Sequence, residues 1–210
     1  MRKGRVGLNI LCFIACALVL SGFSVFFALG GVADRNEILH RAKQPEGKKL
    51  LIIIGAAELG IGIYGAWLFG IGYDWGAFFA LASYLLAITP EDIRQHTIAD
   101  AATLTFGVLF LLLRLSRFQT VELIDALLGA AVGAVLLGLP YLIRRSSIGL
   151  GDVKILAVCG LMLGPIGVIT FLMRAFLAIF VYSLVQLIRK KVTLHSETPF
   201  APFLLLAALI

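Results

Sequence analysis

Acidic side chains stand at two points where the chain leaves or enters long apolar stretches. Glu91, Asp92 and Asp100 occur in the segment PEDIRQHTIADAATL, and Asp152 occurs in the hexamer GLGDVK. Ionised groups beside hydrocarbon are costly and usually have a function. Two carboxyl groups that share a partly dry cleft do not ionise together easily, so one is left as a base and the other as an acid. Such a pair can activate a water molecule and protonate a carbonyl oxygen without a metal ion or a covalent intermediate.

Asp152 also has a purely structural interpretation. A carboxylate in the first turn of a helix is stabilised by free backbone N–H groups and by the helix dipole. The preceding Gly149 and Gly151 allow backbone geometry and close approach that larger residues resist. Lys154 would then be a charge that orients the chain in a membrane. The hexamer alone leaves the structural and the catalytic interpretations open.

The elements that carry these acids are predicted to be membrane-spanning helices. Hydrophobic residues make up 60% of the 210 residues, charged residues make up 14%, and the mean hydropathy is +1.02. A soluble domain is far more polar than this. We therefore expect an all-α membrane protein, a polytopic bundle of about six to eight transmembrane helices. The predicted spans are 8–31, 50–72, 75–89, 101–118, 126–143, 153–171 and 172–188, followed by an apolar tail at 201–210.

Proline and glycine predict the breaks between these spans. Pro90 should end the span that begins at 75, and the turn between the last two spans should fall at Gly164-Pro165 or just after. The run 7–31 is longer than a signal-peptide core and lacks a clear cleavage site, so we expect a retained first span. We predict one integral-membrane domain, 1–210, made of a first span with a short cytoplasmic loop (8–49) and a catalytic bundle (50–210).

The charge distribution predicts an orientation in the membrane. The net charge is +6, but the basic residues lie in short connectors, which indicates membrane topology and not a nucleic-acid surface. Most of the 18 lysine and arginine residues become cytoplasmic when the N-terminus is outside, although Arg2, Lys3 and Arg5 argue the other way. In either orientation the segments 89–100 and 144–154 are separated by two spans, so their acids emerge on the same face.

No metal ion or cofactor is expected. The three cysteines fall within apolar runs and form no CxxC pair. The three histidines are scattered over loops without the spacing of metal ligands.

Glu58 is an acid within an apolar span, which is a functional hypothesis by default. We favour a structural role instead, in which Glu58 is protonated and bonds to a neighbouring helix. Arg174 is a candidate partner for it, but we expect this arginine to extend to the membrane interface.

Three segments, in order along the chain, resemble one family. SIGLGDVKILAVCGLMLG resembles the GxGDxK segment of the type IV prepilin peptidases, the membrane leader peptidases that process prepilins and pseudopilins. Upstream, Asp92 is followed by Ile98, Asp100 and Thr103, which is similar to the family pattern D-x5-I-P-D/N-x2-T. The closing TPFAPFLLLAAL is similar to the family's PFGPFL run.

The resemblance implies an aspartic endopeptidase of the GxGD type in the inner (plasma) membrane, with its active site toward the cytoplasm. Asp92 and Asp152 would be the catalytic pair, with Gly149, Gly151 and Lys154 as motif residues that support it. The implied partner is a prepilin or pseudopilin precursor with a basic leader and an apolar N-terminal helix in the lipid. Such precursors serve type IV pili and protein secretion. Neither a metal nor a nucleic acid is implied.

The chain departs from the family pattern at a few positions. Ala99 stands where the family has proline, and Ala201 stands where it has the glycine of PFGPF. Neither change removes a reactive group. Asp100 matches an acidic or amide position with a structural role. The loop 33–49 contains no cysteine and resembles the short form without the methyltransferase insert, so we do not predict methylation.

Two alternatives remain open. Tyr73-Asp74 followed by GLGD resembles the presenilin-like intramembrane proteases, but that turn is one span away from 89–100 and therefore on the opposite face. A transport or assembly protein of the membrane would use the same acids without catalysis. No internal repeat of the carrier kind is visible in the sequence.

Overall fold

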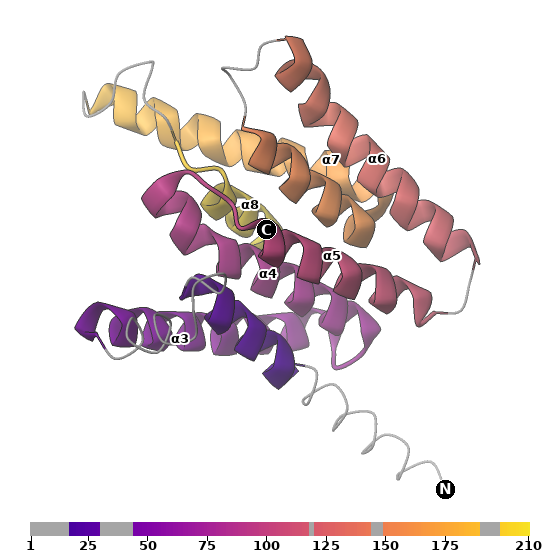
Figure 1. The fold of residues 1–210 in the computed structure, drawn as a ribbon, viewed down its shortest axis with the longest axis horizontal. Coiled ribbons are helices and arrows are strands. Elements are labelled where there is room, and N and C mark those ends of the chain that lie inside the picture. Colours follow the sequence, from indigo (N-terminus) through magenta and orange to yellow (C-terminus); the bar gives the residue numbers. More distant parts are fainter. Residues whose placement is uncertain (1–16, 30–43, 118–119, 144–148, 190–197) are drawn as a thin grey trace, which may run out of the picture. The chain divides into compact units, whose positions relative to one another are not determined.

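Helices make up nearly all of the chain that the structure describes. The computed structural model describes residues 17–29, 44–117, 120–143, 149–189 and 198–210. Its helices are Ala17–Ala28, α3 (Pro45–Phe69), α4 (Tyr73–Gln95), α5 (Asp100–Leu115), α6 (Thr120–Ile143), α7 (Leu150–Ile188) and α8 (Ala201–Leu209) (Figure 1). The described residues contain no strand, which confirms the predicted all-α class. The remainder of the predicted first span, 8–31, lies outside them.

Three of the described helices, α3, α6 and α7, are long and apolar enough to cross a bilayer. Large apolar side chains on these helices are exposed, as helices that face lipid require, for example Ile52, Val135 and Phe180. The fold is therefore that of a helical membrane protein, and the total number of spans stays a prediction. The chain divides into two compact units, one up to Pro90 and one from Glu91. The single domain 1–210 also stays a prediction.

The predicted end of a helix at Pro90 is wrong. Helix α4 continues through Pro90 to Gln95, because an apolar helix tolerates a proline when neighbouring groups compensate for the lost backbone hydrogen bond. The helix ends at His96, whose φ of 51° is left-handed and whose N–H donates to the Asp92 carbonyl oxygen at 3.0 Å. A left-handed residue after the last turn is a common helix end. Asp92 consequently lies in a helical turn and not in a loop.

In the unit up to Pro90, buried polar contacts join α3 to α4. The Ser83 hydroxyl on α4 donates to Glu58 Oε2 on α3 at 2.8 Å, and Glu58 is only 2% exposed. Trp75 Nε1 donates to the Gly62 carbonyl oxygen at 2.8 Å. A polar group away from water is costly unless it is hydrogen-bonded. The Ser83 contact confirms that Glu58 bonds to a neighbouring helix, while its protonation stays a prediction.

In the unit from Glu91 onward, the backbones of α6 and α7 lie in close contact. Each helix carries a Gly-x3-Gly pair, Gly129 with Gly133 on α6 and Gly160 with Gly164 on α7. A Cβ atom on Gly129 would overlap the Gly160 carbonyl oxygen, and one on Gly133 would overlap the Leu156 carbonyl oxygen. Small residues at this spacing let two membrane helices approach closely. This pairing was not predicted from the sequence.

The predicted turn at Gly164-Pro165 is confirmed. Gly164 has a φ of 70° and a ψ of 177°, which interrupts α7, and Pro165 follows it directly. Glycine adopts a left-handed φ without steric cost, and a Cβ atom at this position would overlap the Asp125 carboxylate. The chain turns back here (Figure 1), so α7 contains both of the last two predicted spans.

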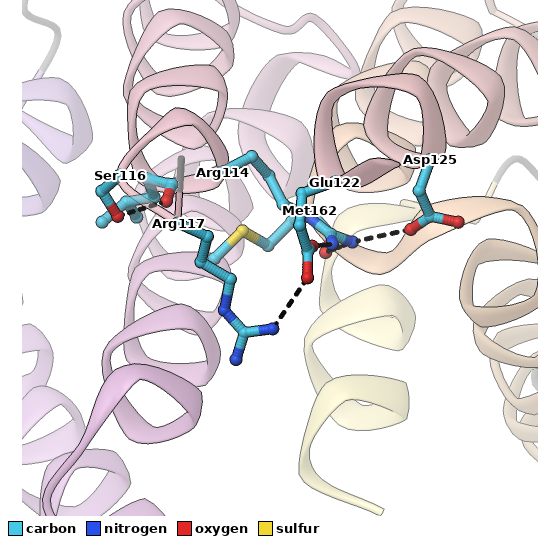
Figure 2. A network of polar contacts seen from close by, with 7 residues as sticks. Arg114, Ser116, Arg117, Glu122, Asp125 and Met162 are labelled. Atoms are coloured by element: carbon cyan, nitrogen blue, oxygen red, sulfur yellow. Dashed lines mark hydrogen bonds and ion pairs between the residues drawn. The ribbon is translucent and has the colours of Figure 1, made fainter. Parts of the chain in front are cut away.

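A charged cluster joins α5, α6 and α7 at the end of α5 that lies away from Asp100. Arg114 on α5 forms an ion pair with Glu122 on α6, and it also donates to Asp125 Oδ2 at 3.2 Å (Figure 2). The same guanidinium donates to the Met162 carbonyl oxygen on α7 at 2.7 Å. Arg117 adds a second ion pair to Glu122 at 2.9 Å. Because a guanidinium presents five N–H donors in a rigid fork, one arginine fixes the relative positions of all three helices.

Alanine substitutions on α6 test the close packing of α6 and α7. Gly133→Ala places a methyl group against the Leu156 carbonyl oxygen and should lower the free energy of unfolding by roughly 1–3 kcal/mol. Gly138→Ala on the same helix is the matched control, because its new methyl group would have Val153 Cγ1 as its nearest neighbour, at 3.7 Å. Thermal unfolding of both proteins in one detergent measures the difference. Equal stability of the two variants would contradict the close contact.

Candidate active site

Asp92 is held by the C-terminal part of the chain. Its side chain lies in the last part of α4, and the residue is only 4% exposed. The Ala201 N–H donates to Asp92 Oδ2 at 2.8 Å, and the Phe200 N–H donates to the same carboxylate. Burial raises the pKa of Asp92, while these two N–H groups and the charge of His96 act to lower it. Asp92, predicted from the first motif, is therefore hydrogen-bonded to the closing PFAPFL motif, which lies far along the chain.

Asp152 occupies the first turn of α7. Its Oδ2 accepts a hydrogen bond from the Gly149 N–H at 3.3 Å, so the structural role at a helix start is present in the fold. Burial, followed by the negative charge of Asp92, raises the pKa of Asp152 to about 6, against the lowering effect of the Gly149 hydrogen bond. The structural interpretation therefore does not exclude the chemical one.

The structure brings Asp92 and Asp152 close enough to act on each other electrostatically. Both lie outside the apolar parts of their helices. Asp92 follows the apolar run of α4, and Asp152 precedes the apolar run of α7, which begins at Ile155. Helices α5 and α6 separate the two acids in sequence, as the predicted two spans require. Their catalytic roles stay a prediction.

The other predicted motif residues fix the connection between α4 and α5 against the start of α7. Gly151 faces Ile98, and a Cβ atom at Gly151 would come within 2.6 Å of Ile98 Cδ1. Lys154 Nζ donates to Asp100 Oδ1 at 2.6 Å. Gly149 precedes the first turn of α7 and supplies the N–H that binds Asp152. One apolar and one ionic contact thus hold the chain that follows Asp92 beside the turn that carries Asp152.

The two departures from the family pattern fit the backbone. Ala99 precedes α5 with a φ of −66°, which is the value that a proline ring imposes. Ala201 begins α8, is fully buried, and is not among the residues with a positive φ. The backbone therefore needs neither a proline at 99 nor a glycine at 201 to keep this geometry.

The role of the C-terminal segment was not predicted. The run TPFAPFLLLAAL was recognised only as a resemblance, and no residue in it was assigned to the site. The sequence feature that could have indicated this role is the pair Pro199 and Pro202. These prolines flank a short stretch at the start of α8 where few backbone N–H groups are available. No sequence pattern predicted that this stretch would contact Asp92.

An apolar groove begins at the ion pair between Asp100 and Lys154. It lies between α5 and α7, has a volume of about 640 Å³, and has the Asp100–Lys154 ion pair in its lining. From that pair the lining continues along α5 to Leu111 and along α7 to Leu161, and it includes the small residues Gly107 and Ala157. Within the described part of the chain, no three His, Cys, Asp or Glu side chains gather as metal ligands. The absence of a cofactor stays an expectation.

The fold and the site define a class, the helical membrane proteins with two interacting carboxyl groups at helix ends. Residues 79–184 match the model of the type IV leader peptidase family. The chain belongs to this family, and the match contains two of the three segments that resemble it, those around Asp92 and Asp152.

Curated relatives give the same result. The chain is 33% identical over 135 residues, 62% of this chain and 47% of the relative, to a prepilin leader peptidase/N-methyltransferase of Pectobacterium carotovorum subsp. carotovorum. It is 31% identical over 160 residues, 71% of this chain and 54% of the relative, to a protein of the same description from Stutzerimonas stutzeri. The chain spans about half the length of the curated relatives that it matches. No solved structure matches it significantly.

Removal of one carboxylate should change the ionisation of the other. In Asp92→Asn the pKa of Asp152 should fall below about 6, because a neighbouring anion disfavours ionisation and is lost in this variant. Infrared titration of the Asp152 carboxyl band, identified by its loss in Asp152→Asn, measures the midpoint. Asp74→Asn, at the other end of α4, is the control and should leave the midpoint in place. An unchanged midpoint in Asp92→Asn would show that the two groups do not interact.

Proposed function

We propose that this protein is a membrane aspartic endopeptidase that removes the leader peptide of type IV prepilin-like precursors. The observation that carries this proposal is the pair formed by Asp92 and Asp152, in which the charge of one acts on the ionisation of the other. A coupled pair of this kind supplies a base and an acid in one site at the same pH. Membership of the leader peptidase family supports the same activity.

Peptide hydrolysis by such a pair needs no covalent intermediate. The ionised carboxylate accepts a proton from a water molecule, whose oxygen forms a bond to the carbonyl carbon of the scissile peptide. The protonated carboxyl group donates its proton to the carbonyl oxygen, so that no free oxyanion accumulates. When the C–N bond of the diol intermediate breaks, the leaving nitrogen takes a proton from the first carboxyl group, and the second regains its proton from a hydroxyl of the diol, which becomes the new carbonyl.

The position of the pair suits a bond at the boundary between membrane and water. Asp92 and Asp152 lie just beyond the apolar runs of α4 and α7, at the depth where a bilayer core would end. The distribution of lysine and arginine makes this side cytoplasmic in the proposed orientation, within the inner membrane. Basic connectors would repel a basic leader, so recognition should depend on the substrate backbone and on apolar contacts.

The groove between α5 and α7 is the proposed position of the substrate's apolar helix. Its polar end is the Asp100–Lys154 pair, two residues beyond Asp152, and its lining is otherwise almost entirely apolar. From Asp100 to Leu111 the groove follows about three turns of α5. Small residues in its wall, Gly107 and Ala157, permit close approach of another helix. A substrate helix placed here would present the residues that precede it to the acids.

Peptidase activity alone is proposed for this chain. The curated relatives are described as both leader peptidases and N-methyltransferases. The loop 33–49 has no cysteine and falls partly outside the described residues. A presenilin-like pairing through Asp74 gains no support, because Asp74 lies in the first turn of α4 and Asp92 near its other end.

Substitution of either acid should abolish leader removal. Asp92→Asn and Asp152→Asn should each reduce cleavage at least about 100-fold, because an amide replaces neither a general base nor a general acid. The assay follows the mass shift of a co-reconstituted precursor in lipid vesicles. Asp74→Asn should cleave normally, and a chelator should have no effect. Cleavage by either of the Asp92→Asn and Asp152→Asn variants would show that the substituted residue is not part of the mechanism. A wild-type protein that is expressed but cleaves no precursor would favour a transport or assembly role.

Filling the groove should weaken substrate binding without affecting the chemical step. Ala157→Phe should raise KM for a complete precursor about tenfold with kcat unchanged, because it removes a contact made equally in the ground state and the transition state. Ala131→Phe, on an exposed part of α6 outside the groove, is the control. A short peptide that contains the scissile bond but no apolar helix should be cleaved equally by both variants. Unchanged KM for the precursor would exclude the groove.

A further inference from the structure

We propose that residues 199–202 are a third part of the active site and that they select Asp92 as the general base, which leaves Asp152 as the general acid. This assignment rests on the proposed function, which requires one base and one acid but does not say which is which. The segment acts through its backbone, so it is a positioning element and not a catalytic group.

The first turn of α8 has few N–H groups to offer. Pro202 has none, and the N–H groups of Phe203 and Leu204 already donate to the Phe200 carbonyl oxygen at 3.1 and 3.2 Å. The Ala201 N–H therefore remains for a partner outside α8, and it takes Asp92 Oδ2 at 2.8 Å. The Asp92 carboxylate thus supplies the cap that the start of α8 lacks in its own sequence, since Phe200 provides no side-chain cap.

The two acids differ in their donors. Asp92 accepts from two N–H groups, those of Ala201 and Phe200, at the positive end of the α8 dipole. Asp152 accepts from the Gly149 N–H at the longer distance of 3.3 Å. Hydrogen bonds donated to a carboxylate favour its ionised form. Burial disfavours ionisation of both acids, so the donors distinguish them, and the donors favour ionisation of Asp92 before that of Asp152.

The charges around Asp92 point in the same direction. His96, which directly follows α4, favours the ionised form of Asp92. On α7, Asp152 is the opposing acid, and Lys154 is paired with Asp100 of α5. Residues 198–210, which include α8, carry no charged side chain. The negative charge of Asp92 raises the pKa of Asp152, as expected when Asp92 loses its proton first.

The roles define the proton movements of the reaction. Asp92 accepts the proton of the attacking water as the water oxygen bonds to the carbonyl carbon, and Asp152 donates its proton to the carbonyl oxygen. Asp92 then passes its proton to the leaving nitrogen as the C–N bond breaks, and Asp152 recovers a proton from the second hydroxyl of the diol. The pair ends in its starting state, so no other reactant is needed.

A backbone substitution tests the role of the segment. Ala201→Pro removes the N–H, so the pKa of Asp92 should rise and the acid limb of the pH profile for kcat/KM should move up by about one pH unit. Ala201→Gly retains the N–H and should keep the limb at its wild-type position. Limbs that coincide for Ala201→Pro and Ala201→Gly would overturn the proposal.

A second measurement does not depend on activity. Infrared titration of the Asp92 carboxyl band should show the same upward shift in Ala201→Pro, and in the wild type Asp92 should ionise at a lower pH than Asp152. Ionisation of Asp152 first would overturn the assignment even if cleavage is observed. If Ala201→Pro does not fold, the order of ionisation in the wild type decides the question. A wild type that cleaves no precursor at any pH, but shows the predicted order, would refute the proposed function and leave the role of the segment intact.

Discussion

Two carboxyl groups that lie close together with little water around them repel each other when both are ionised. The candidate active site depends on holding the two carboxyl groups close to each other in spite of this repulsion. Asp92 would reduce it by turning toward solvent, but its carboxylate is nearly buried and is held by the start of α8. Asp152 is held by the Gly149 N–H in the first turn of α7. The fold therefore has to hold the last turn of α4 and the starts of α7 and α8 together when both acids are ionised.

Contacts that fix the start of α7 join it to α5 and α6 between Lys154 and Gly164. At one end of α5, Asp100 binds Lys154 of α7, and at the other end Arg114 binds the Met162 carbonyl oxygen of the same helix. Between these ends α6 packs its glycines directly on the α7 backbone. Helix α5 is joined to α7 at both of its ends, and α6 packs closely on α7, so α7 has little freedom to slide against either helix. The start of α7 is thereby placed by residues far from the acids.

The departures from the family pattern show which properties of the site are chemical and which belong to the backbone. Ala99 has a proline-like φ without a proline ring, and Ala201 donates its N–H without being a glycine. A backbone N–H or a φ value can be supplied by several residue types, whereas a titratable carboxyl group cannot. This explains why a chain with both substitutions still places its acids together. The start of α8 likewise acts on Asp92 through its backbone: two N–H groups and the positive end of the helix dipole favour the ionised carboxylate without any charged side chain from α8.

The sequence by itself determined the properties that depend on local composition and on counting. Long apolar runs predicted the all-α membrane class, and the two apolar segments between Asp92 and Asp152 predicted that these acids come close to each other. Gly164-Pro165 predicted a turn, because glycine permits a left-handed φ and proline cannot continue a regular helix. Tertiary structure decided the rest: the continuation of α4 through Pro90, the facing glycine pairs, the Arg114 cluster, and the hydrogen bond from Ala201 to Asp92. Each of these features depends on a contact with a distant residue, and local sequence patterns do not predict that residue. The residues packed around a proline decide whether it ends a helix, and those packed around an N–H group decide whether it bonds to a carboxylate. Such packing forms only when segments distant in sequence come together in the fold.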